Sequence, residues 1–418
     1  MEQKTLLKNK KNQGNGGETM AKRDDSVKKK VPELRFKGFT DDWEQRKIKD
    51  IFKITRGQVL AATETSEEKS DISPFPVYSS QTKNNGLMGY YKDYLFDTAI
   101  TWTTDGANAG TVSYRSGRFY STNVNGVLIS DKGYTNKAIS EILNLEAWKW
   151  VSHVGNPKLM NNVMGDISIM IPSSFEEQDR LSDFLNQLDD TIALHQRKLD
   201  LLKEQKKGYL QKMFPKNGKK VPELRFAGFA DDWEQRKLSE GTSKIGDGLH
   251  GTPNYSDNGD VFFINGNNLV NGKIVITKET KLVTESNQSK DDKLLNRDTI
   301  LMSINGTIGN LAWYNNERVM LGKSAAYLTV SNFDKKFIFS YLQTSTIKNY
   351  FLNNLTGTTI KNLGLKTIRD TTLFVPTLEE QQKIGSFFKQ LDDTIALHQR
   401  KLDLLKEQKK DFLQKMFV

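Results

Sequence analysis

The chain has 418 residues, 36% hydrophobic content and a formal net charge of +10, and this length is enough for two or more packed domains. The absence of cysteine excludes disulfides, thiolate zinc sites and a cysteine nucleophile. No run of about 18 apolar residues is present, so we predict a soluble, cytoplasmic protein without a transmembrane helix.

The first 30 residues are predicted to be a disordered basic tail. They hold nine lysine or arginine residues against four acidic residues, so a net +5 of the +10 lies in this segment. The rest of the chain is only mildly basic. Net charge by itself therefore favours nucleic-acid binding only weakly.

Two blocks of sequence occur twice. KKVPELRFKGFTDDWEQRK begins at Lys29 and returns as KKVPELRFAGFADDWEQRK at Lys219, whereas QLDDTIALHQRKLDLLKEQKK begins unchanged at Gln187 and Gln390. Two copies of this arrangement indicate two related halves with pseudo-twofold symmetry. The predicted divisions are the tail at 1–30, a first variable domain at 31–172, a helix at 173–215, a linker at 216–220, a second variable domain at 221–376 and a helix at 377–418.

The variable segments between the repeats are typical of strands and turns. β-Branched and aromatic residues alternate in DTAITWTTDGANAGTVSYRSGRFYSTNVNGVLIS and DTILMSINGTIGNLAWYNNE, and Asn-Gly or Asp-Gly pairs interrupt such segments. We therefore predict an α+β fold in which each half contains one β-rich domain followed by a long helix.

Each repeated helical segment follows a proline, Pro172 or Pro376, and carries Glu-Glu-Gln in its first turn. Such a helix can pack on its own domain, but two identical heptad seams are complementary under a twofold operation, so we predict that the two helices pair. The predicted pairing residues are Leu185, Leu188, Ile192, His195, Leu199, Leu202, Phe388, Leu391, Ile395, His398, Leu402 and Leu405. The two histidines either mark the register of the seam or face solvent.

No catalytic constellation is visible in the sequence. GDGLHG at 246–251 matches a dinucleotide-binding fingerprint, but no apolar strand precedes it. LGKS at 321–324 lacks the first glycine of a phosphate-binding loop. A histidine-based metal site would have to combine His153 and His250 from different halves. We therefore predict no catalytic residue, metal or cofactor in this chain.

Polar residues instead gather in turns of both variable segments. Asn, Gln, Lys and Ser side chains read base edges and bind phosphates, although each is also an ordinary turn residue. The predicted DNA-binding candidates are Ser79, Ser80, Gln81, Thr82, Lys83, Asn84, Asn85, Thr104, Asn108, Asn156 and Lys158 in the first half, and Lys244, His250, Thr252, Asn265, Asn267, Asn268, Ser303, Asn305, Thr307, Thr358, Thr359 and Lys361 in the second.

Together these features resemble the specificity subunits of type I restriction–modification systems. The matching segments are VPELRF with a later Trp at 31–43 and 221–233, FPVYSSQTKNNG at 75–86, DGLHGTP at 247–253, GTIG at 306–309 and the Pro and Glu-Glu-Gln that begin each helix. The resemblance covers essentially everything after residue 30 and implies that the two helices form an antiparallel coiled coil.

The resemblance also implies a function. The chain would be a non-catalytic subunit that reads an asymmetric, interrupted double-stranded DNA target with its two domains. It would dock two adenine-N6 methyltransferase subunits, which bring S-adenosylmethionine, and then restriction motor subunits, which use ATP and Mg²⁺ to cleave DNA. Two rival interpretations remain: an enzyme that methylates or cleaves DNA by itself, and a coiled-coil scaffold with two β-rich domains that do not bind DNA.

Overall fold

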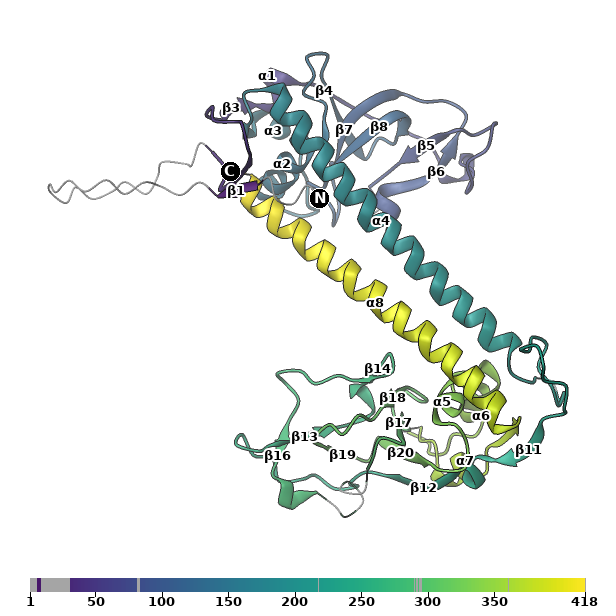
Figure 1. Cartoon of the computed structure of the whole chain (residues 1–418). Helices are drawn as coiled ribbons and strands as arrows, with labels where there is room; N and C mark the ends of the chain where they lie inside the picture. The colour runs from purple at the N-terminus through teal and green to yellow at the C-terminus, as the bar shows by residue number, and fades with distance from the viewer. Residues whose placement is uncertain are drawn as a thin grey trace, which may run out of the picture. The chain divides into compact units, whose positions relative to one another are not determined.

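The computed structural model describes residues 6–8, 31–80, 83–216, 218–288, 290, 292, 295–359 and 361–417. It divides into two compact units, Met1–Gln196 with Lys401–Val418 and Arg197–Arg400 (Figure 1). The predicted tail lies outside the described residues, apart from strand β1 (Leu6–Lys8), which pairs antiparallel with β2 (Leu34–Phe36). None of the described helices is long and apolar enough to cross a membrane.

The first unit is built on a six-stranded sheet in the order β4-β9-β7-β8-β5-β6, in which only β5 and β8 run parallel. Its elements are β3 (Glu44–Lys47), α1 (Ile48–Ile51), β4 (Lys53–Arg56), β5 (Phe75–Tyr78), β6 (Leu87–Tyr91), β7 (Phe96–Thr103), β8 (Val112–Ser121), β9 (Asn125–Ile129), α2 (Lys137–Ala147), α3 (Asn161–Asp166) and β10 (Ser168–Ile171). The core packs α2 against β7, β8 and β9, and β10 forms a separate pair with β3.

The second unit contains a four-stranded sheet, β12-β20-β17-β18, and a three-stranded sheet, β16-β13-β19. Its elements are β11 (Glu234–Lys237), β12 (Thr242–Asp247), β13 (Val261–Ile264), β14 (Leu269–Val270), β15 (Lys273–Ile274), β16 (Leu282–Val283), β17 (Thr299–Ser303), β18 (Leu311–Trp313), β19 (Val319–Leu321), β20 (Ala325–Val330), α5 (Lys335–Tyr341), α6 (Ser345–Asn353), α7 (Leu365–Arg369) and β21 (Thr372–Val375). Strands β11 and β21 pair as β3 and β10 do.

The two sheets share the same strand pairing and register despite their different sequences. Trp102 lies between Val112 and Gly126 on its neighbouring strands, and Met302 lies between Leu311 and Ala326 in the same pattern. The parallel pair of β5 and β8 corresponds to β13 and β19, so the long strand β8 matches β18 and β19 together. Residues of the two units can therefore be compared position by position.

The long helices are α4 (Phe175–Lys212) and α8 (Leu378–Met416), and each is anchored at its start by the repeated blocks. Arg35 of the first VPELRF block donates two hydrogen bonds to Glu177, at 2.6 and 2.7 Å. Arg225 of the second block binds Glu380 in the same way, at 2.7 and 2.8 Å. Each ion pair thus joins one VPELRF block, called the lead-in block below, to the first turn of the helix in its own half.

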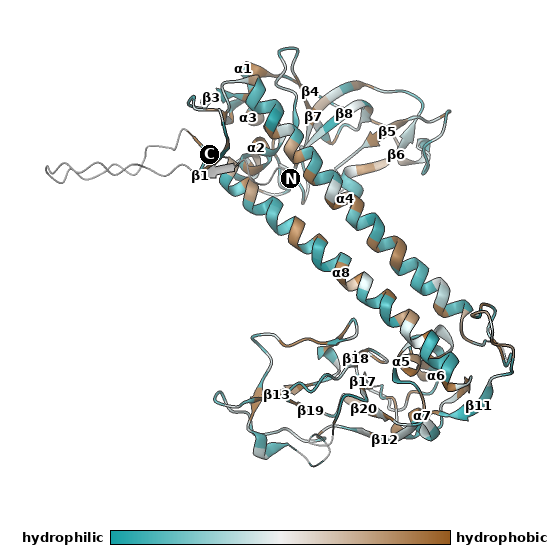
Figure 2. Ribbon diagram, viewed as in Figure 1, coloured by the Kyte–Doolittle hydropathy of each residue, from teal (hydrophilic) through white to brown (hydrophobic). Residues whose placement is uncertain are grey.

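The helices pair antiparallel within each unit, which confirms the predicted coiled coil. In the first unit the Phe184 and Phe412 ring centroids lie 5.1 Å apart, and Lys409 Nζ lies 2.6 Å from Asp189 Oδ1. The second unit repeats this arrangement, with Phe387 against Tyr209 at 5.1 Å and Lys206 Nζ 2.6 Å from Asp392 Oδ1. As residue numbers rise along one helix, those of its partner fall. Brown and teal residues alternate along both helices in Figure 2.

The predicted seam residues are buried or half-buried. Leu185, Leu199 and Leu402 are each 1% exposed, and Phe388 is fully buried. His195 and His398 are half-buried, which favours the seam position for them over the solvent-facing alternative.

A small ion cluster reinforces the pairing in the first unit. Asp189 accepts from Lys409 at 2.6 Å and from Lys137 at 2.8 Å, and Lys137 also binds Glu141 at 2.6 Å. Burial raises the pKa of Asp189, but the hydrogen bonds from both lysines outweigh this effect and hold the pKa below its ordinary value. Asp189 therefore stays ionised at neutral pH.

The last residues of each helix belong to the core of the other half. Met416 and Phe417, at the end of α8, pack in the core of the first unit, where the Phe417 ring lies 6.3 Å from that of Trp43. Met213 and Phe214, which follow α4, pack in the core of the second unit, with Phe214 6.4 Å from Trp233. Each unit is therefore completed by a segment from the opposite half of the sequence.

Candidate nucleic-acid interface

One turn of the first unit gathers the ends of several strands. This first hub turn comprises Ser121–Asn125, between β8 and β9. The Gln58 amide donates to Ser121 O at 3.0 Å, and the Thr104 amide donates to Val124 O at 3.0 Å. The Thr122 amide donates to Tyr78 O at 2.9 Å, directly before the predicted turn at 79–85. Segments far apart in sequence thus meet at one end of the strands of this sheet.

The three predicted polar turns of the first unit come together around this hub. Asn108 Nδ2 donates to Ser80 O at 3.5 Å, which links the first and second turns. Asp105 and Lys158 pair as an isolated antiparallel bridge, and the Leu159 amide donates to Thr104 O at 2.8 Å, which links the second and third. The three turns therefore lie together as one cluster.

The second unit repeats the arrangement around a second hub turn, Leu321–Ala325. The Leu249 amide donates to Leu321 O at 2.7 Å, the Gly266 amide to Ser324 Oγ at 2.8 Å and the Ile304 amide to Ser324 O at 3.0 Å. The Leu363 amide donates to Ile304 O at 2.8 Å, as Leu159 does to Thr104. The predicted turns at 247–252, 265–268, 303–307 and 358–361 therefore lie around one hub.

Most of the candidate side chains in these turns reach the surface, but some serve the turns themselves. Thr104 is 1% exposed and donates to Val124 O at 3.0 Å, whereas Ser303 is fully buried and accepts from the Asn310 amide at 2.9 Å. The exposed candidates are Asn84, Asn85, Asn156 and Lys158 in the first unit and Lys244, His250, Thr252, Asn267, Thr307, Thr358, Thr359 and Lys361 in the second. The half-buried candidates are Ser79, Ser80, Asn108, Asn265, Asn268 and Asn305. Gln81 and Thr82 lie outside the described residues, as does the side chain of Lys83.

Several candidates of the second unit make local contacts. Asn268 accepts from the Asn265 amide at 2.9 Å and donates to Val275 O at 3.0 Å, so its amide group holds the turn. His250 lies 2.8 Å from Asp247 on an exposed surface. Lys244 lies on β12 opposite Thr329, three residues before the turn at 247–252.

Sequence analysis missed the two hub turns and one flanking segment. Asn123 and Lys323 are exposed at equivalent positions of the first and second hub turns. Arg56 and Gln58, which are also exposed, are the counterparts of Asp247 and Leu249, because the amides of Gln58 and Leu249 bind equivalent residues of the hubs. Alignment of the two halves on their strands, rather than on polar motifs, is the signal that would have found them.

The candidate lysines Lys158 and Lys361 do not occupy equivalent positions in the two units. Lys158 pairs with Asp105 in the first unit, and Asn362 pairs with Asn305 in the second. Lys158 therefore corresponds to Asn362, and Lys361 lies one residue before that position. The two lysines thus lie at different positions around the two hub turns.

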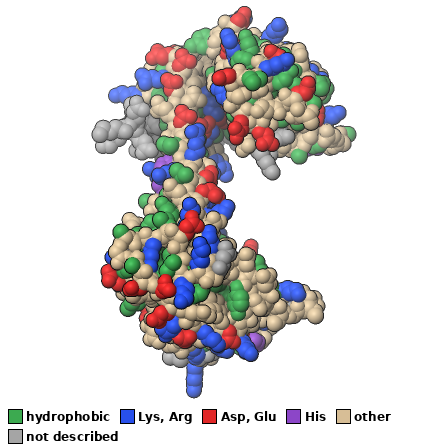
Figure 3. All heavy atoms as spheres, turned by 90° about the vertical axis from the view of Figure 1, so that its right-hand side faces the viewer, with side chains coloured by type: hydrophobic (Ala, Val, Ile, Leu, Met, Phe, Trp, Pro, Cys, Tyr) green, Lys and Arg blue, Asp and Glu red, His purple; other side chains and the backbone are tan. Residues whose placement is uncertain are grey.

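Charge alone does not locate the interface. On the face drawn in Figure 3, cationic and anionic side chains are intermixed on both units. Among the described residues, no group of three or more His, Asp or Glu side chains is placed to hold a metal ion. The chemistry of these turns is that of hydrogen-bonding and cationic side chains, which suits contacts to base edges and phosphates.

Comparison with known proteins identifies the family. The family model described as "Type I restriction modification DNA specificity domain" matches residues 40–204 and 230–407. A Mycoplasma pneumoniae protein described as the N-terminus of a putative type I specificity subunit is 40% identical to this chain over 143 residues. The match covers 34% of this chain and 74% of that protein. A second from the same organism is 26% identical over 344 residues, or 81% of this chain and 86% of the other. In fold, the chain is similar to the type I S subunit from M. genitalium, with a TM-score of 0.66 and 16% identity over 93% of this chain and 99% of that one. The chain therefore belongs to the family of non-catalytic DNA specificity subunits of type I restriction–modification systems, and it carries the specificity domain twice.

Proposed function

We propose that the chain reads a bipartite, asymmetric double-stranded DNA target, one half-site with each unit. The observation that carries this proposal is that the two hub turns share their backbone hydrogen bonds but present different side chains. Asn123 stands where the second unit has Lys323, and Arg56 stands where it has Asp247. Side chains with different hydrogen-bonding groups, held by the same backbone arrangement, discriminate different base pairs.

We further propose that the repeated helices dock two identical methyltransferase subunits. Leu194 and Leu201 lie one heptad apart on α4 and are 63% and 52% exposed, and their counterparts Leu397 and Leu404 on α8 are 60% and 53% exposed. Exposed large apolar residues on a helix face are typical of a surface that a partner covers. Because both helices present the same residues, one kind of partner fits both.

In this complex the chemistry belongs to the partners. The methyltransferase subunits would hold S-adenosylmethionine and methylate adenine N6, and the restriction motor subunits would use ATP and Mg²⁺. The specificity subunit contributes the choice of site, and the assembly acts on DNA in the cytoplasm.

Reconstitution with a methyltransferase subunit tests the function directly. We expect methylome sequencing of cells that express both proteins to return one two-part motif with unrelated half-sites, whereas cells that express the chain alone show no new methylation. Replacing residues 221–376 with a second copy of 31–172 should convert the motif to a palindrome. Absence of any salt-dependent DNA binding by the wild-type complex would instead favour the scaffold interpretation.

Exposed lysines near the two hub turns are expected to contact phosphates. Lys158→Ala or Lys361→Ala should weaken binding to all DNA sequences alike and reduce the salt slope of log Kd by about 1, because a phosphate contact releases a counterion. Fluorescence anisotropy with specific and random duplexes over a range of salt concentrations measures both effects.

Two other lysines provide matched controls for this experiment. Lys132 and Lys336 are exposed beyond the ends of β9 and β20 that lie away from the hub turns. Lys132→Ala and Lys336→Ala change the net charge equally and should leave the salt slope unchanged. An equal effect of all four substitutions would mean that only overall charge matters.

A further inference from the structure

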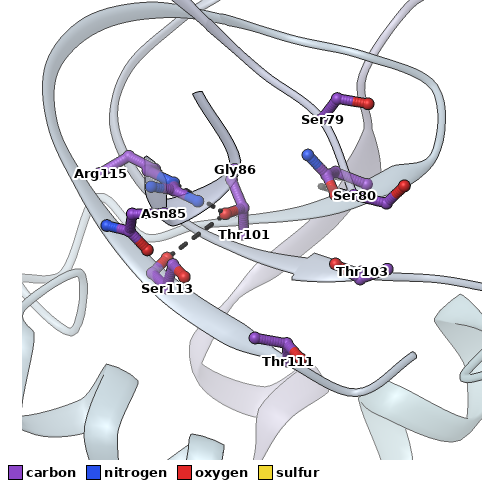
Figure 4. Close-up of a pocket in the computed structure, with 10 residues that line it drawn as sticks. Ser79, Ser80, Asn85, Gly86, Thr101, Thr103, Thr111, Ser113 and Arg115 are labelled. Carbon is purple, nitrogen blue, oxygen red and sulfur yellow. Dashed lines mark hydrogen bonds between the residues drawn. The ribbon is translucent and has the colours of Figure 1, made fainter. Parts of the chain in front are cut away.

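The sheet of the first unit contains a small polar cavity behind the predicted turn at 79–85. It has a volume of about 80 Å³, which is room for several water molecules. Figure 4 shows Arg115, Thr101 and Ser113 on neighbouring strands of its floor, with Asn85 beside Arg115 and with Ser79 and Ser80 from the turn. Most of these side chains offer hydroxyl, amide or guanidinium donors to the space between them.

Arg115 is a buried cation that no carboxylate pairs with among the residues that the structure describes. Its side chain is 6% exposed, its Nε donates to Thr101 Oγ1 at 3.3 Å, and its guanidinium carbon lies 3.8 Å from the ring centroid of Tyr78. Burial lowers the pKa of Arg115, and among the described residues only the Tyr78 phenol acts electrostatically against this effect. The guanidinium nevertheless remains protonated at neutral pH, so a charge is buried without a carboxylate.

The second unit shows that this fold does not need a polar group here. Thr101 faces Ser113 across β7 and β8, and in the second unit Leu301 faces Ala312 in the same register. The positions Tyr78, Thr101, Ser113, Arg115 and Asn125 correspond to Ile264, Leu301, Ala312, Tyr314 and Ala325. All five residues of the second unit belong to one buried apolar cluster.

The equivalent positions of the two sheets thus form an apolar core in the second unit and a polar cavity with a buried charge in the first. Burial of an uncompensated charge is far less favourable than apolar packing of the same volume, because the charge loses its hydration without gaining a partner. A ligand that supplies the missing negative charge accounts for the difference. The uncharged edge of a base can accept hydrogen bonds from arginine, but it cannot neutralise the guanidinium.

We propose that the Arg115 cavity binds a phosphate group. This inference rests on the proposed function, because the phosphate that we expect there is a backbone phosphate of the DNA half-site read by the first unit. Ser79, Ser80 and Asn85 line the cavity and belong to the turn predicted to contact DNA, so a bound strand lies next to the cavity. Arginine and serine or threonine hydroxyls are the donors that phosphate oxygens accept.

Phosphate binding can be measured on the full chain without DNA. We expect the unfolding midpoint of the wild type to rise with millimolar phosphate compared with chloride at equal ionic strength, because a ligand of the folded state stabilises it. Arg115→Gln should abolish this rise. Arg115→Tyr introduces the residue type that the second unit has at the equivalent position, and it should also abolish the rise. This variant still tests the proposal if the glutamine variant does not fold.

Arg118→Gln is the matched control, because Arg118 is a 56% exposed cation on the same strand, β8. It removes the same charge and should keep the phosphate response. A wild type that does not respond to phosphate, or a response that survives in both Arg115 variants, would overturn the proposal.

DNA binding by the reconstituted complex with the methyltransferase subunit distinguishes a backbone phosphate of DNA from free phosphate as the ligand of the cavity. We expect Arg115→Gln to weaken DNA binding about tenfold or more and to reduce the salt slope by about 1, with Arg118→Gln unchanged. An unchanged slope together with a lost phosphate response would assign the cavity to free phosphate and overturn the DNA assignment. If the wild-type complex does not bind DNA specifically, the proposed function is wrong. The phosphate titration then still tests whether the Arg115 cavity binds phosphate.

Discussion

A chain truncated after Phe214 is expected to form a homodimer. It would keep the first β-rich domain and α4 but lose Met416 and Phe417, which complete the core of the first unit. Its own Met213 and Phe214 end the same Gln-Lys-Met-Phe sequence and pack in the second unit much as Met416 and Phe417 pack in the first. A second copy can therefore supply the missing segment, and the paired seams bury their apolar residues in a twofold dimer.

Light scattering at micromolar concentration measures this association. Methylome sequencing of cells that also express the methyltransferase subunit shows which DNA motif the dimer selects. The dimer should direct methylation to a palindrome built from the first half-site. The control is Phe214→Asp in the truncated chain, which should leave a monomer because a carboxylate cannot enter the site beside Trp43. A truncated wild-type chain that stays monomeric at high concentration would contradict the exchange of helix ends.

The second large effect is expected at the buried ion pair of the first lead-in block. Arg35→Met leaves the Glu177 side chain, which is 1% exposed, without its partner, and breaking such a buried pair costs about 3–5 kcal/mol. Arg35→Met with Glu177→Met removes both charges and should recover most of this loss. Urea unfolding of the full chain, followed by circular dichroism, gives the free energies of unfolding.

An exposed pair of the same type provides the comparison. Arg46 lies 2.8 Å from Glu44, with exposed fractions of 45% and 32%, and Arg46→Met should cost less than about 1 kcal/mol. A loss at Arg35 no larger than this would mean that the lead-in block does not anchor the helix.

The sequence predicts the doubled architecture well because that information is local. Heptad spacing, the prolines before each helix and the alternating strand patterns are all read within short windows. The exchange of helix ends is different. Phe417 and Trp43 are 374 residues apart in the sequence, and each has a repeated counterpart, Phe214 and Trp233, so the sequence pattern alone does not say which phenylalanine packs against which tryptophan.

The candidate interface was predictable only in part, for a related reason. Turn residues such as Asn84 and Asn85, which adopt φ angles of 50° and 55°, are recognisable from composition. Arg115 lies inside strand β8, where a polar residue reads as an ordinary solvent-facing position of an alternating strand. Its burial follows from strand pairings that close over it, and these pairings are visible only in three dimensions.

The exchange of helix ends also bears on synthesis at the ribosome. The strands of the first unit's sheet are made early, yet the residues that fill its core beside Trp43 are Met416 and Phe417, which are made only after the strands of the second unit. At about 5–20 residues per second, the roughly 200 residues between Phe214 and Phe417 take about 10–40 s to emerge. During that interval the apolar surface around Trp43 is open, and the identical ending at Phe214 on a neighbouring nascent chain fits it. Rapid translation of the second half therefore protects the monomer, and slow translation favours pairing between chains.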